Sequence, residues 1–494
     1  MIRSFYWKLL TALALSALLV ACGGGGGGGT SGGTSAGTSS GVITGFGSVV
    51  VNGVRFDDNG TDILLVDEDD ASSSGDKAGT RDDLEVGMVV EVENETRGNG
   101  RHANEIRVEK IVTGRVQTVN RTNSTLLVLG QTVLVDAQTS FTGRDGSNAL
   151  ITDITGLAPS DFVEVSGFSK PDGSILATLI QKKNFQRGVT TLKVKGKISN
   201  LSATTFTINA QVIDFASVPA LITPNGTILK RDDLVAVKTK LTPAILGDTL
   251  VAQKVRVKNS RLQTRDGHKI EIEGIIESII NTIDTKTFVI NGITVDGSNL
   301  PGFGALAAGQ KIEVEGVMVN GILVPTKAKN EQESSIRVEA PIQSLGADSI
   351  TALGVTFNVN EFTRFEDKVS RTRPFNKENF GTVLLVGDRV AIRGFKVAAD
   401  DTLTATRIER VESRDFVSVQ GPLTSKAPSS AFTILGVTVN IGSSTHFNDP
   451  LTLSTLFSDL TPIGTTLLKA KGVVANDGTP SALDATEIEI ENDD

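Results

Sequence analysis

A short pattern recurs six times between residues 41 and 494, and it restricts the chain to repeated, strand-based folds. Each copy has an apolar residue or Asn, then usually Gly, then a run in which apolar and polar residues alternate. The six copies read VNGVRF at Val51, VLGQTVLV at Val128, INAQVIDF at Ile208, INGITV at Ile290, ALGVTFNV at Ala352 and ILGVTVNI at Ile434. Self-similarity of this kind is the signature of a repeat architecture, so each unit should be one small domain.

Other segments recur around this pattern in most units. A Gly-led strand precedes it, as in TGRVQTV at Thr113 and EGIIESI at Glu273, and the fifth copy has Ala340 in place of the glycine. After the pattern, a Leu followed three positions later by Gly or Ser introduces a strongly alternating strand, as in LEVGMVVEV at Leu84. In the third unit we assign that position to LVAVKTK at Leu234, which lacks the glycine. A closing strand then ends each unit.

The residue period within a unit is two, which is the period of a half-buried strand. In VVEVEN, Val90 and Val92 lie on one face of the strand while Glu91 and Glu93 lie on the other. Such alternation is typical of a sheet with one buried and one solvated face. A flat sheet of five short strands would leave two open edges, and closure into a small barrel removes them.

The predicted fold class is therefore all-β, as a tandem array of about six small antiparallel barrels. The order of three strands, a short link and two strands is similar to that of an OB-type barrel. An open sandwich or an SH3-like barrel fits the same pattern nearly as well.

The motif set resembles a family of bacterial envelope proteins that is known only as a domain of unknown function, number 5666. The resemblance rests on the strand–NG–strand, Leu-x-x-Gly-Asp and closing-strand patterns, and it extends over 41–494. It is weakest in the third unit, where Ala210 stands at the glycine position. It implies repeated small β domains on exported proteins, and it implies no activity and no site residues.

The start of the chain has the pattern of an export signal. Arg3 and Lys8 precede the uncharged run LLTALALSALLV, which is shorter than the roughly 20 residues that a membrane-spanning helix needs. A basic region, a short apolar core and a small residue before the cut are typical of a signal peptide. The segment LVAC, which ends at Cys22, resembles the lipobox of bacterial lipoproteins. That resemblance implies cleavage after residue 21 and a diacylglycerol on the Cys22 thiol.

Cys22 is the only cysteine in the sequence, so it cannot form an internal disulfide. Acyl chains would anchor the protein firmly, since each buried methylene contributes about 0.8 kcal/mol. Gly23 stands where inner-membrane lipoproteins of Gram-negative bacteria commonly have Asp, so the resemblance implies a place in the cell envelope, at the outer membrane. Residues 22–40 carry no charge and little apolar surface, and we expect them to form a flexible linker.

We therefore divide the chain into a signal peptide (1–21), a lipidated linker (22–40) and six β repeats. The repeats are expected at 41–110, 111–186, 187–260, 261–334, 335–410 and 411–494.

Charge differs strongly between units of this acidic chain. The segment 41–110 has 7 Lys and Arg against 16 Asp and Glu, whereas 187–259 has 11 against 4. Barrels of opposite sign could attract each other, or the basic barrel could bind an anionic envelope polymer. Charges scattered over solvated faces are the third interpretation.

Dense acidic residues in the first unit form a candidate metal site. Asp57, Asn59, Asp62, Asp67 and Asp69 could supply oxygen ligands to Ca²⁺. Their spacing does not match an EF-hand loop, and Asp-Asn-Gly sequences are common in solvated turns, which is the alternative interpretation. We expect no resident metal and no cofactor apart from the covalent lipid on Cys22.

Catalytic patterns are absent from the sequence. His102, His268 and His446 fall in different units and have no Cys partners for zinc. The nucleophile and phosphate-loop motifs are missing as well. The only Tyr and Trp, at positions 6 and 7, belong to the signal peptide, so the rest lacks the usual stacking platforms for nucleic acid, and no nucleic-acid partner is expected.

These observations predict a non-enzymatic, lipid-anchored envelope protein that presents a string of barrels as a spacer, scaffold or set of interaction modules. Such a string should be extended, and its partners would be the membrane and another envelope protein. The alternative is a periplasmic or surface protein that binds an anionic polymer or a metal on barrel faces or in inter-domain clefts.

Overall fold

The described part of the chain is almost entirely β-structure. The computed structural model describes residues 36–66, 76–98, 100–121, 123–136, 138–186, 190–216, 218, 220–222, 228–239, 249–258, 265–330, 336–396, 402–427, 430–448, 450–458, 461–464, 466–475 and 481–491. Cys22 and the glycine tract that follows it lie outside these residues. Within them, no helix is both long enough and apolar enough to cross a membrane.

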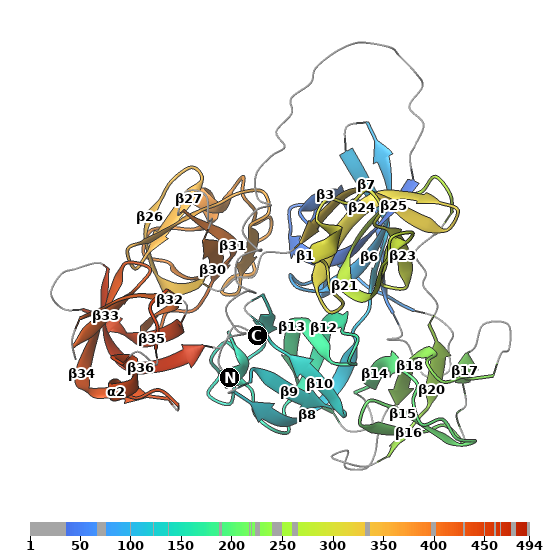
Figure 1. The fold of residues 1–494 in the computed structure, drawn as a ribbon, viewed down its shortest axis with the longest axis horizontal. Helices are drawn as coiled ribbons and strands as arrows, with labels where there is room; N and C mark the ends of the chain where they lie inside the picture. The colour runs from blue at the N-terminus through green and yellow to red at the C-terminus, as the bar shows by residue number, and fades with distance from the viewer. Residues whose placement is uncertain are drawn as a thin grey trace, which may run out of the picture.

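The described residues form six barrels of five principal strands each (Figure 1). The first barrel has β1 (Ala36–Gly45), β2 (Val49–Val51), β3 (Val54–Asp57), β6 (Val89–Arg97) and β7 (Gly100–Val108), with β4 (Asp62–Leu65) beside β7 and β5 (Lys77–Ala78) beside β4. The second has β8 (Val112–Asn120), β9 (Thr125–Val128), β10 (Gln131–Leu134), β12 (Phe162–Ser169) and β13 (Ile175–Lys183), with β11 (Ser140–Thr142) beside β13. The third has β14 (Leu192–Lys197), β15 (Thr205–Ile208), β16 (Gln211–Asp214), β18 (Leu234–Thr239) and a divided last strand, β19 (Leu250–Val251) and β20 (Lys254–Val257), with β17 (Ala220–Ile222) beside β20.

The remaining barrels follow the same plan. The fourth has β21 (Lys269–Asn281), β22 (Lys286–Ile290), β23 (Ile293–Asp296), β24 (Lys311–Val319) and β25 (Ile322–Asn330). The fifth has β26 (Ile336–Leu345), β27 (Ser349–Ala352), β28 (Val355–Asn358), β30 (Arg389–Lys396) and β31 (Leu403–Arg410), with β29 (Arg364–Asp367) beside β31. The sixth has β32 (Val417–Ala427), β33 (Ala431–Ile434), β34 (Val437–Phe447), β35 (Leu467–Val474) and β36 (Ala482–Glu491).

Strand pairing in the barrels identifies the topology. In the fourth barrel, β21 pairs antiparallel with both β22 and β24, and β22 pairs with β23. β25 pairs antiparallel with β24 and parallel with β23, so the strand order closes as 1-2-3-5-4-1. The first, second, fifth and sixth barrels repeat these pairings. This is the order of an OB-type barrel, which confirms the predicted fold class and removes the sandwich and SH3-like alternatives.

The repeated NG pattern forms the turn between the second and third strands. In the first barrel, Asn52 and Gly53 have φ values of 53° and 78°. Positive φ at both central residues is typical of a type I′ turn, whose twist matches that of the flanking strands. The glycine of the preceding Gly-led strand makes room for this turn, since a Cβ on Gly41 would lie 1.8 Å from Oδ1 of Asn52. The two sequence motifs recur together because they meet in space.

The Leu-x-x-Gly pattern forms a turn before the fourth strand. In the first barrel it follows the short helix η1 (Arg81–Asp83), with Leu84 fully buried and Gly87 at a φ of 94°. The corresponding short helices of the second, fourth, fifth and sixth barrels are η2 (Ile154–Gly156), η4 (Phe303–Ala305), α1 (Phe380–Val383) and α2 (Leu453–Leu456). In the third barrel our assignment of this motif to Leu234 is wrong, because Leu234 already begins β18. The equivalent of the Leu is Leu229, which is buried. The equivalent of the Gly is Asp232, which has a φ of 69° and whose side chain tolerates this conformation.

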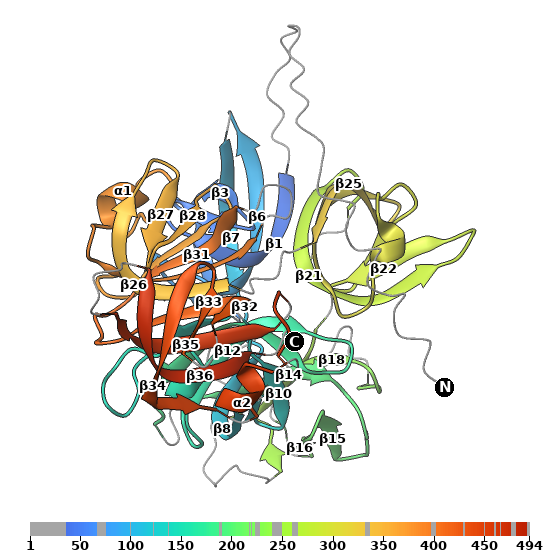
Figure 2. The same cartoon turned by 60° about the vertical axis from the view of Figure 1, so that its left-hand side comes forward.

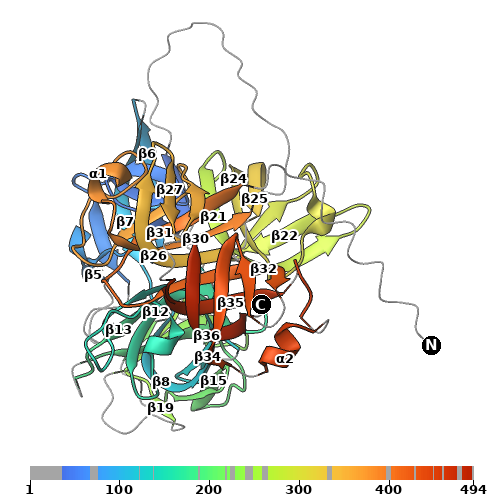
Figure 3. The same ribbon diagram turned by 90° about the vertical axis from the view of Figure 1, so that its left-hand side faces the viewer.

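The barrels associate in pairs through their first strands. β1 pairs in parallel with β21, and Figure 2 shows β6 and β21 on opposite sides of β1. β8 pairs with β14. β26 pairs with β32, and Figure 3 shows the strands of the sixth barrel directly below those of the fifth. The apolar cores of the fifth and sixth barrels form one continuous cluster, and so do those of the second and third. The expected extended string is therefore wrong, because the first strands share hydrogen bonds between barrels.

The predicted linker ends earlier than expected. β1 begins at Ala36, so residues 36–40 belong to the first barrel and not to the linker. Thr38 and Ser39 are buried because their backbone pairs with β6 on one side and β21 on the other. Their small polar side chains gave no apolar signal, yet they suit a strand that lies between two barrels.

Candidate functional site

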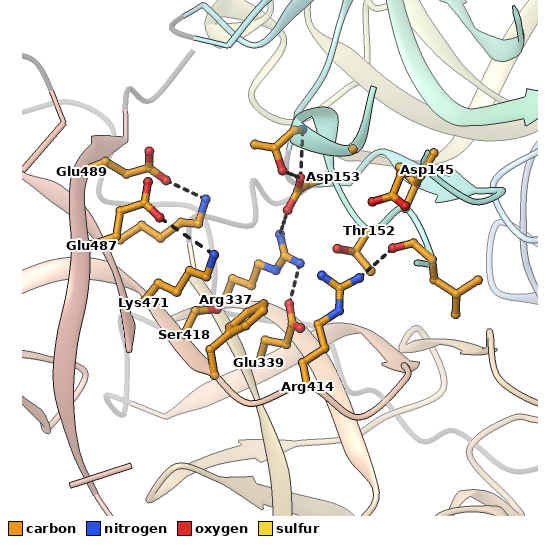
Figure 4. A pocket seen from close by; sticks show the side chains of 16 residues that line it. Asp145, Thr152, Asp153, Arg337, Glu339, Arg414, Ser418, Lys471, Glu487 and Glu489 are labelled. Atoms are coloured by element: carbon orange, nitrogen blue, oxygen red, sulfur yellow. Dashed lines mark hydrogen bonds and ion pairs between the residues drawn. The ribbon is translucent and has the colours of Figure 1, made fainter. Parts of the chain in front are cut away.

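A cleft opens where the second, fifth and sixth barrels meet, and we name it the 2-5-6 cleft (Figure 4). Its volume is about 300 Å³. It is lined by Asp145, Leu150, Ile151, Thr152, Asp153, Thr155, Gly156, Arg337, Glu339, Arg414, Phe416, Ser418, Lys469, Lys471, Glu487 and Glu489.

Strand alternation places the charged side chains of this cleft. In β26, Val338 points into the core, so its neighbours Arg337 and Glu339 point outward. The same holds in β35 and β36, where buried Ala470 and Ile488 each lie between two charged residues. The cleft is thus made of the outer faces of strands that carry their apolar residues inward.

The charges in the 2-5-6 cleft are paired with one another (Figure 4). Nζ of Lys469 lies 2.7 Å from a Glu489 carboxylate oxygen. The Arg337 guanidinium lies 3.1 Å from Glu339 in its own strand and 3.9 Å from Asp153 in the second barrel. The network therefore joins barrels as well as lining a cavity.

The aromatic ring in the cleft also faces cations. Phe416 lies under the charged groups of Arg389, Arg414 and Lys471, at 4.9, 5.7 and 4.4 Å from the ring centroid. Contacts of this kind stabilise by about 0.5–1 kcal/mol at exposed sites and by more where water is excluded. Because these cations lie against it, the ring contributes to the barrel junction and offers little surface on which a ligand could stack.

Asp153 is held in its charged form. Burial alone would raise its pKa, but Arg337 and Lys469 lower the pKa to about 2. A carboxyl with that pKa is ionised throughout the neutral range and cannot donate a proton as a general acid. The arrangement therefore holds the Asp153 carboxylate in its charged form and connects the second barrel to the fifth and sixth through Arg337 and Lys469.

At a second charged junction, a carboxylate of the first barrel forms ion pairs with lysines of the basic third barrel. Glu109, which follows β7, lies 2.5 Å from Nζ of Lys195, 2.6 Å from that of Lys258 and 3.9 Å from that of Lys193. Burial opposes ionisation of Glu109, yet the three lysines hold its pKa well below its usual range. Of the three interpretations of the charge contrast, attraction between barrels therefore describes these residues, because their charges meet at a junction where each side chain is at most 24% exposed.

A third junction locks the fifth barrel onto a loop of the second. Glu409 is 1% exposed and lies 2.6 Å from both Arg407 and Lys368. These cations and Arg393 also donate to backbone carbonyl groups of 138–141, at 3.2 Å for Arg407, 2.8 Å for Lys368 and 3.0 Å for Arg393. Sequence reasoning missed this cluster, since alternation shows only that these residues point away from their own core.

The candidate calcium ligands are in part brought together. Asp57 accepts hydrogen bonds from the backbone and side-chain nitrogens of Asn59, at 3.2 and 2.6 Å, and so forms an Asx turn. Asp62 is exposed at the start of β4. Asp67 and Asp69 lie outside the described residues. Within the described ranges, no group of three or more His, Cys, Asp and Glu side chains is arranged to hold a metal ion.

The three histidines lie apart in the structure, as their positions in different units predict. His102 in β7 faces Asp57, with 3.6 Å between Nδ1 and the carboxylate. His268 precedes β21 in the fourth barrel, and His446 is exposed near the end of β34 in the sixth.

Comparison with known proteins agrees with the barrel boundaries. A comparison with curated proteins found no match. A solved structure titled "drosophila Unr CSD456" aligns with 45% of this chain and 97% of its own length, at 12% sequence identity and a TM-score of 0.12, which is too loose to carry an argument. The family model described as "Domain of unknown function (DUF5666)" matches residues 113–181, 273–328, 339–409 and 420–489. These segments fall within the second, fourth, fifth and sixth barrels and together exceed half of the sequence, so the chain belongs to the DUF5666 family.

Proposed function

We propose that this protein is a non-enzymatic, lipid-anchored component of the cell envelope whose barrels act together as one rigid scaffold. The pattern that ends at Cys22 supports the anchor and a place at the outer membrane of a Gram-negative bacterium. The scaffold is supported chiefly by the buried ionic junctions between barrels. An interaction module of this kind would present fixed surfaces to another envelope protein.

The buried junctions favour a rigid scaffold over a flexible spacer. Glu109 connects the end of the first barrel to three lysines of the third, and Glu409 lies under the loop of the second barrel. Separating such barrels would expose hydrogen-bonded charges and break strand pairing between β8 and β14 or between β26 and β32. Loss of one partner from a buried charge pair typically destabilises by 3–5 kcal/mol.

The anchor is tested by metabolic labelling with a radioactive fatty acid. The full chain should take up the label and sediment with the outer membrane, while the Cys22→Ala variant should do neither. A Ser16→Ala variant inside the apolar run is the matched control and should behave like the unaltered chain. Label in the Cys22→Ala protein would refute lipidation at this residue.

The scaffold is tested by small-angle X-ray scattering on the Cys22→Ala chain, which lacks the anchor. We expect a compact particle, and Glu109→Lys should enlarge it because a lysine there would repel Lys193, Lys195 and Lys258. Asp284→Lys, in the exposed turn between β21 and β22, makes the same charge change and should leave the radius of gyration unaltered. An elongated particle for the unaltered chain would support a spacer and contradict the rigid scaffold.

A further inference from the structure

The second half of β25, the last strand of the fourth barrel, has one edge without a partner among the described strands. On one side, β25 pairs with β24 from Ile322 to Asn330. On the other side, the pairing that the structure describes is limited to Leu323, opposite Val295 of β23. Figure 2 shows β25 along the upper side of this barrel. The backbone of residues 327–330 therefore presents an open edge, which we name the β25 edge.

The other five barrels place a short extra strand at the corresponding edge. β4, β11, β17, β29 and the end of β34 each pair in parallel with the last strand of their own barrel. In the fifth barrel, β29 lies within the link 359–388, which joins the third strand to the fourth. The link of the fourth barrel, 297–310, is shorter and passes from β23 into η4 without a strand. The fourth barrel therefore lacks the element that covers this edge in the other five.

The extra strands share one register. In each of the five barrels, a large apolar residue of the extra strand lies opposite a core residue of the last strand. These pairs are Ile63 with Ile106, Phe141 with Ile180, Leu221 with Val255, Phe365 with Ile408, and Phe447 with Ile488. All five core residues are fully buried. The register shows what this position accepts, which is a parallel strand with an apolar residue at its centre.

The fourth barrel has a small residue at the position of these core residues. Ala328 pairs with Val314 of β24, just as Ile408 pairs with Ile392 of β30. Ala328 packs against the core of the fourth barrel but is only partly buried. An apolar side chain placed opposite Ala328 would therefore bury more of this surface.

The aromatic residue of the short helix does not replace the missing strand. Phe303 in η4 and Phe380 in α1 are both buried in the helix that precedes the fourth strand. In the fifth barrel, Phe380 packs against Phe365 of β29, with the ring centroids 5.8 Å apart, so one barrel accommodates both side chains. The fourth barrel has the helix residue but no strand to supply the second.

The residues on either side of Ala328 indicate the charge of a partner. Lys327 and Lys329 are exposed and lie opposite Glu315 and Glu313 of β24. Nζ of Lys329 also lies 4.3 Å from the centroid of the Phe362 ring. Among the described ion pairs, Glu315 pairs with Arg101, and neither Lys327 nor Lys329 takes part in one.

These two lysines favour an acidic strand over a second copy of β25. Two copies of this edge would bring lysine against lysine, and like charges directly opposite each other are destabilising. Lysines on an open edge also hinder pairing with unsuited strands. Carboxylates on both sides of the central apolar residue would remove that hindrance, since an ammonium has three donors.

We propose that the β25 edge binds an extended acidic segment of another protein, which is added as a parallel strand. In strand addition, main-chain hydrogen bonds provide affinity and alternate side chains provide specificity. The central apolar residue would pack beside Ala328, and flanking carboxylates would pair with Lys327 and Lys329. This docking role goes beyond the proposed scaffold because it rests on the fourth barrel alone, so it can fail while the scaffold stands.

Fluorescence polarisation on the purified Cys22→Ala chain at low salt tests the β25 edge. The probe is a short labelled peptide with Asp-Phe-Glu at its centre and threonines on both sides. We expect saturable binding that weakens at least about tenfold when Ala replaces the Phe, because burial of a Phe side chain typically contributes that factor. A peptide with Lys-Phe-Lys at its centre should not bind. Absence of saturable binding, or equal binding of the two Phe peptides, would overturn the proposal.

A pair of matched variants locates the binding. Lys327→Gln/Lys329→Gln should weaken binding of the Asp-Phe-Glu peptide about threefold or more, through loss of two exposed ion pairs. Lys269→Gln/Lys286→Gln removes two exposed lysines from β21 and β22 of the same barrel and should bind normally. An equal loss in both variants would show general attraction to lysine and overturn the site. The thermal midpoint of each variant shows that the barrels remain folded.

Hydrogen exchange distinguishes strand addition from other modes of binding. The amides of 322–330 should exchange more slowly in the peptide complex, whereas those of β13, which β11 already covers, should not change. Binding without slower exchange in β25 would overturn strand addition. Analytical ultracentrifugation addresses the other occupant: a dimer of the chain that the peptide dissociates would mean that a second copy covers the edge, and would overturn the acidic partner.

Discussion

The fourth and fifth barrels share one topology but put opposite charge environments on their outer faces. In the fifth barrel, Glu409 is surrounded by Arg407, Lys368 and Arg393, and although burial alone would raise its pKa, these cations hold it far below its usual value. In the fourth, Glu313 lies opposite Glu273 across the strand pair, and its pKa is raised to about 7. Outward-facing carboxyls on the last two strands of a barrel, Glu313 in β24 and Glu409 in β31, can thus have a raised or a lowered pKa, according to the charges that surround them.

Among the substitutions that test this difference, removal of Arg407 should lower the free energy of unfolding most. Arg407→Met leaves Glu409 and Glu366 buried with one cation fewer and removes the donor to the carbonyl group of Gln138. We expect the free energy of unfolding to fall by about 3–5 kcal/mol, the usual result of breaking a buried charge network. Urea unfolding of the full chain measures it.

Lys471→Gln provides the matched control for Arg407→Met. Lys471 is 40% exposed and lies 3.9 Å from Glu487, so its loss should change stability by less than about 1 kcal/mol. A similarly small loss for Arg407→Met would show that the fifth barrel does not depend on its buried network.

The raised pKa of Glu313 should make the fourth barrel less stable as the pH rises, whereas the lowered pKa of Glu409 makes the fifth barrel less stable as the pH falls. Burial raises its pKa most, Glu273 and Glu271 raise it further, and Lys329 opposes them. The folded state then holds the proton more tightly than the unfolded state, so stability is lost as the pH rises from about 4.5 to about 7. Glu313→Gln should stabilise by about 1–3 kcal/mol at pH 8 and by little at pH 4, in urea unfolding at the two pH values. Equal effects at both pH values would contradict the raised pKa.

Asp153 should resemble Glu409 in the sign of its pH dependence, with a smaller effect. Its pKa is lowered to about 2, against burial, by Arg337 of the fifth barrel and Lys469 of the sixth. The stability that it contributes is present above pH 4 and is lost as the pH falls through about 2. Asp153→Asn should destabilise by about 1–2 kcal/mol at pH 7 and by almost nothing at pH 2. The same loss at both pH values would mean that the hydrogen bonds to Thr155, and not the charges, carry the effect.

Local patterns in the sequence predicted the barrels but not the junctions between them. Alternation around Val90 and the NG turn at Asn52 specify strands and hairpins because both depend on neighbours a few residues away. Glu409 and Glu109 also alternate with apolar residues, so the sequence shows that they leave their own core. Nothing in that alternation shows that another barrel covers them.

Two local errors have related physical causes. Residues 36–40 look like linker because they have almost no apolar side chains, yet their backbone pairs with two strands that are distant in the sequence. The Leu-x-x-Gly pattern does not detect Asp232, because an Asp residue can adopt the left-handed backbone conformation that glycine adopts at this position in most units. The 2-5-6 cleft could not be predicted, since it is formed by three barrels and by no single motif.

The smallest prediction tests whether the fourth and fifth barrels differ only in charge. Gly309 and Gly387 occupy the same turn, with φ values of 89° and 93°, and a Cβ at either would meet no atom within 4 Å. Alanine there should therefore destabilise through the backbone alone, by about 1–2 kcal/mol at each position. Urea unfolding should give the same loss for Gly309→Ala and Gly387→Ala, and the losses should not vary between pH 4 and pH 8. A difference between the two would mean that the barrels differ in backbone strain as well, and that Glu313 and Glu409 are not the whole of the contrast.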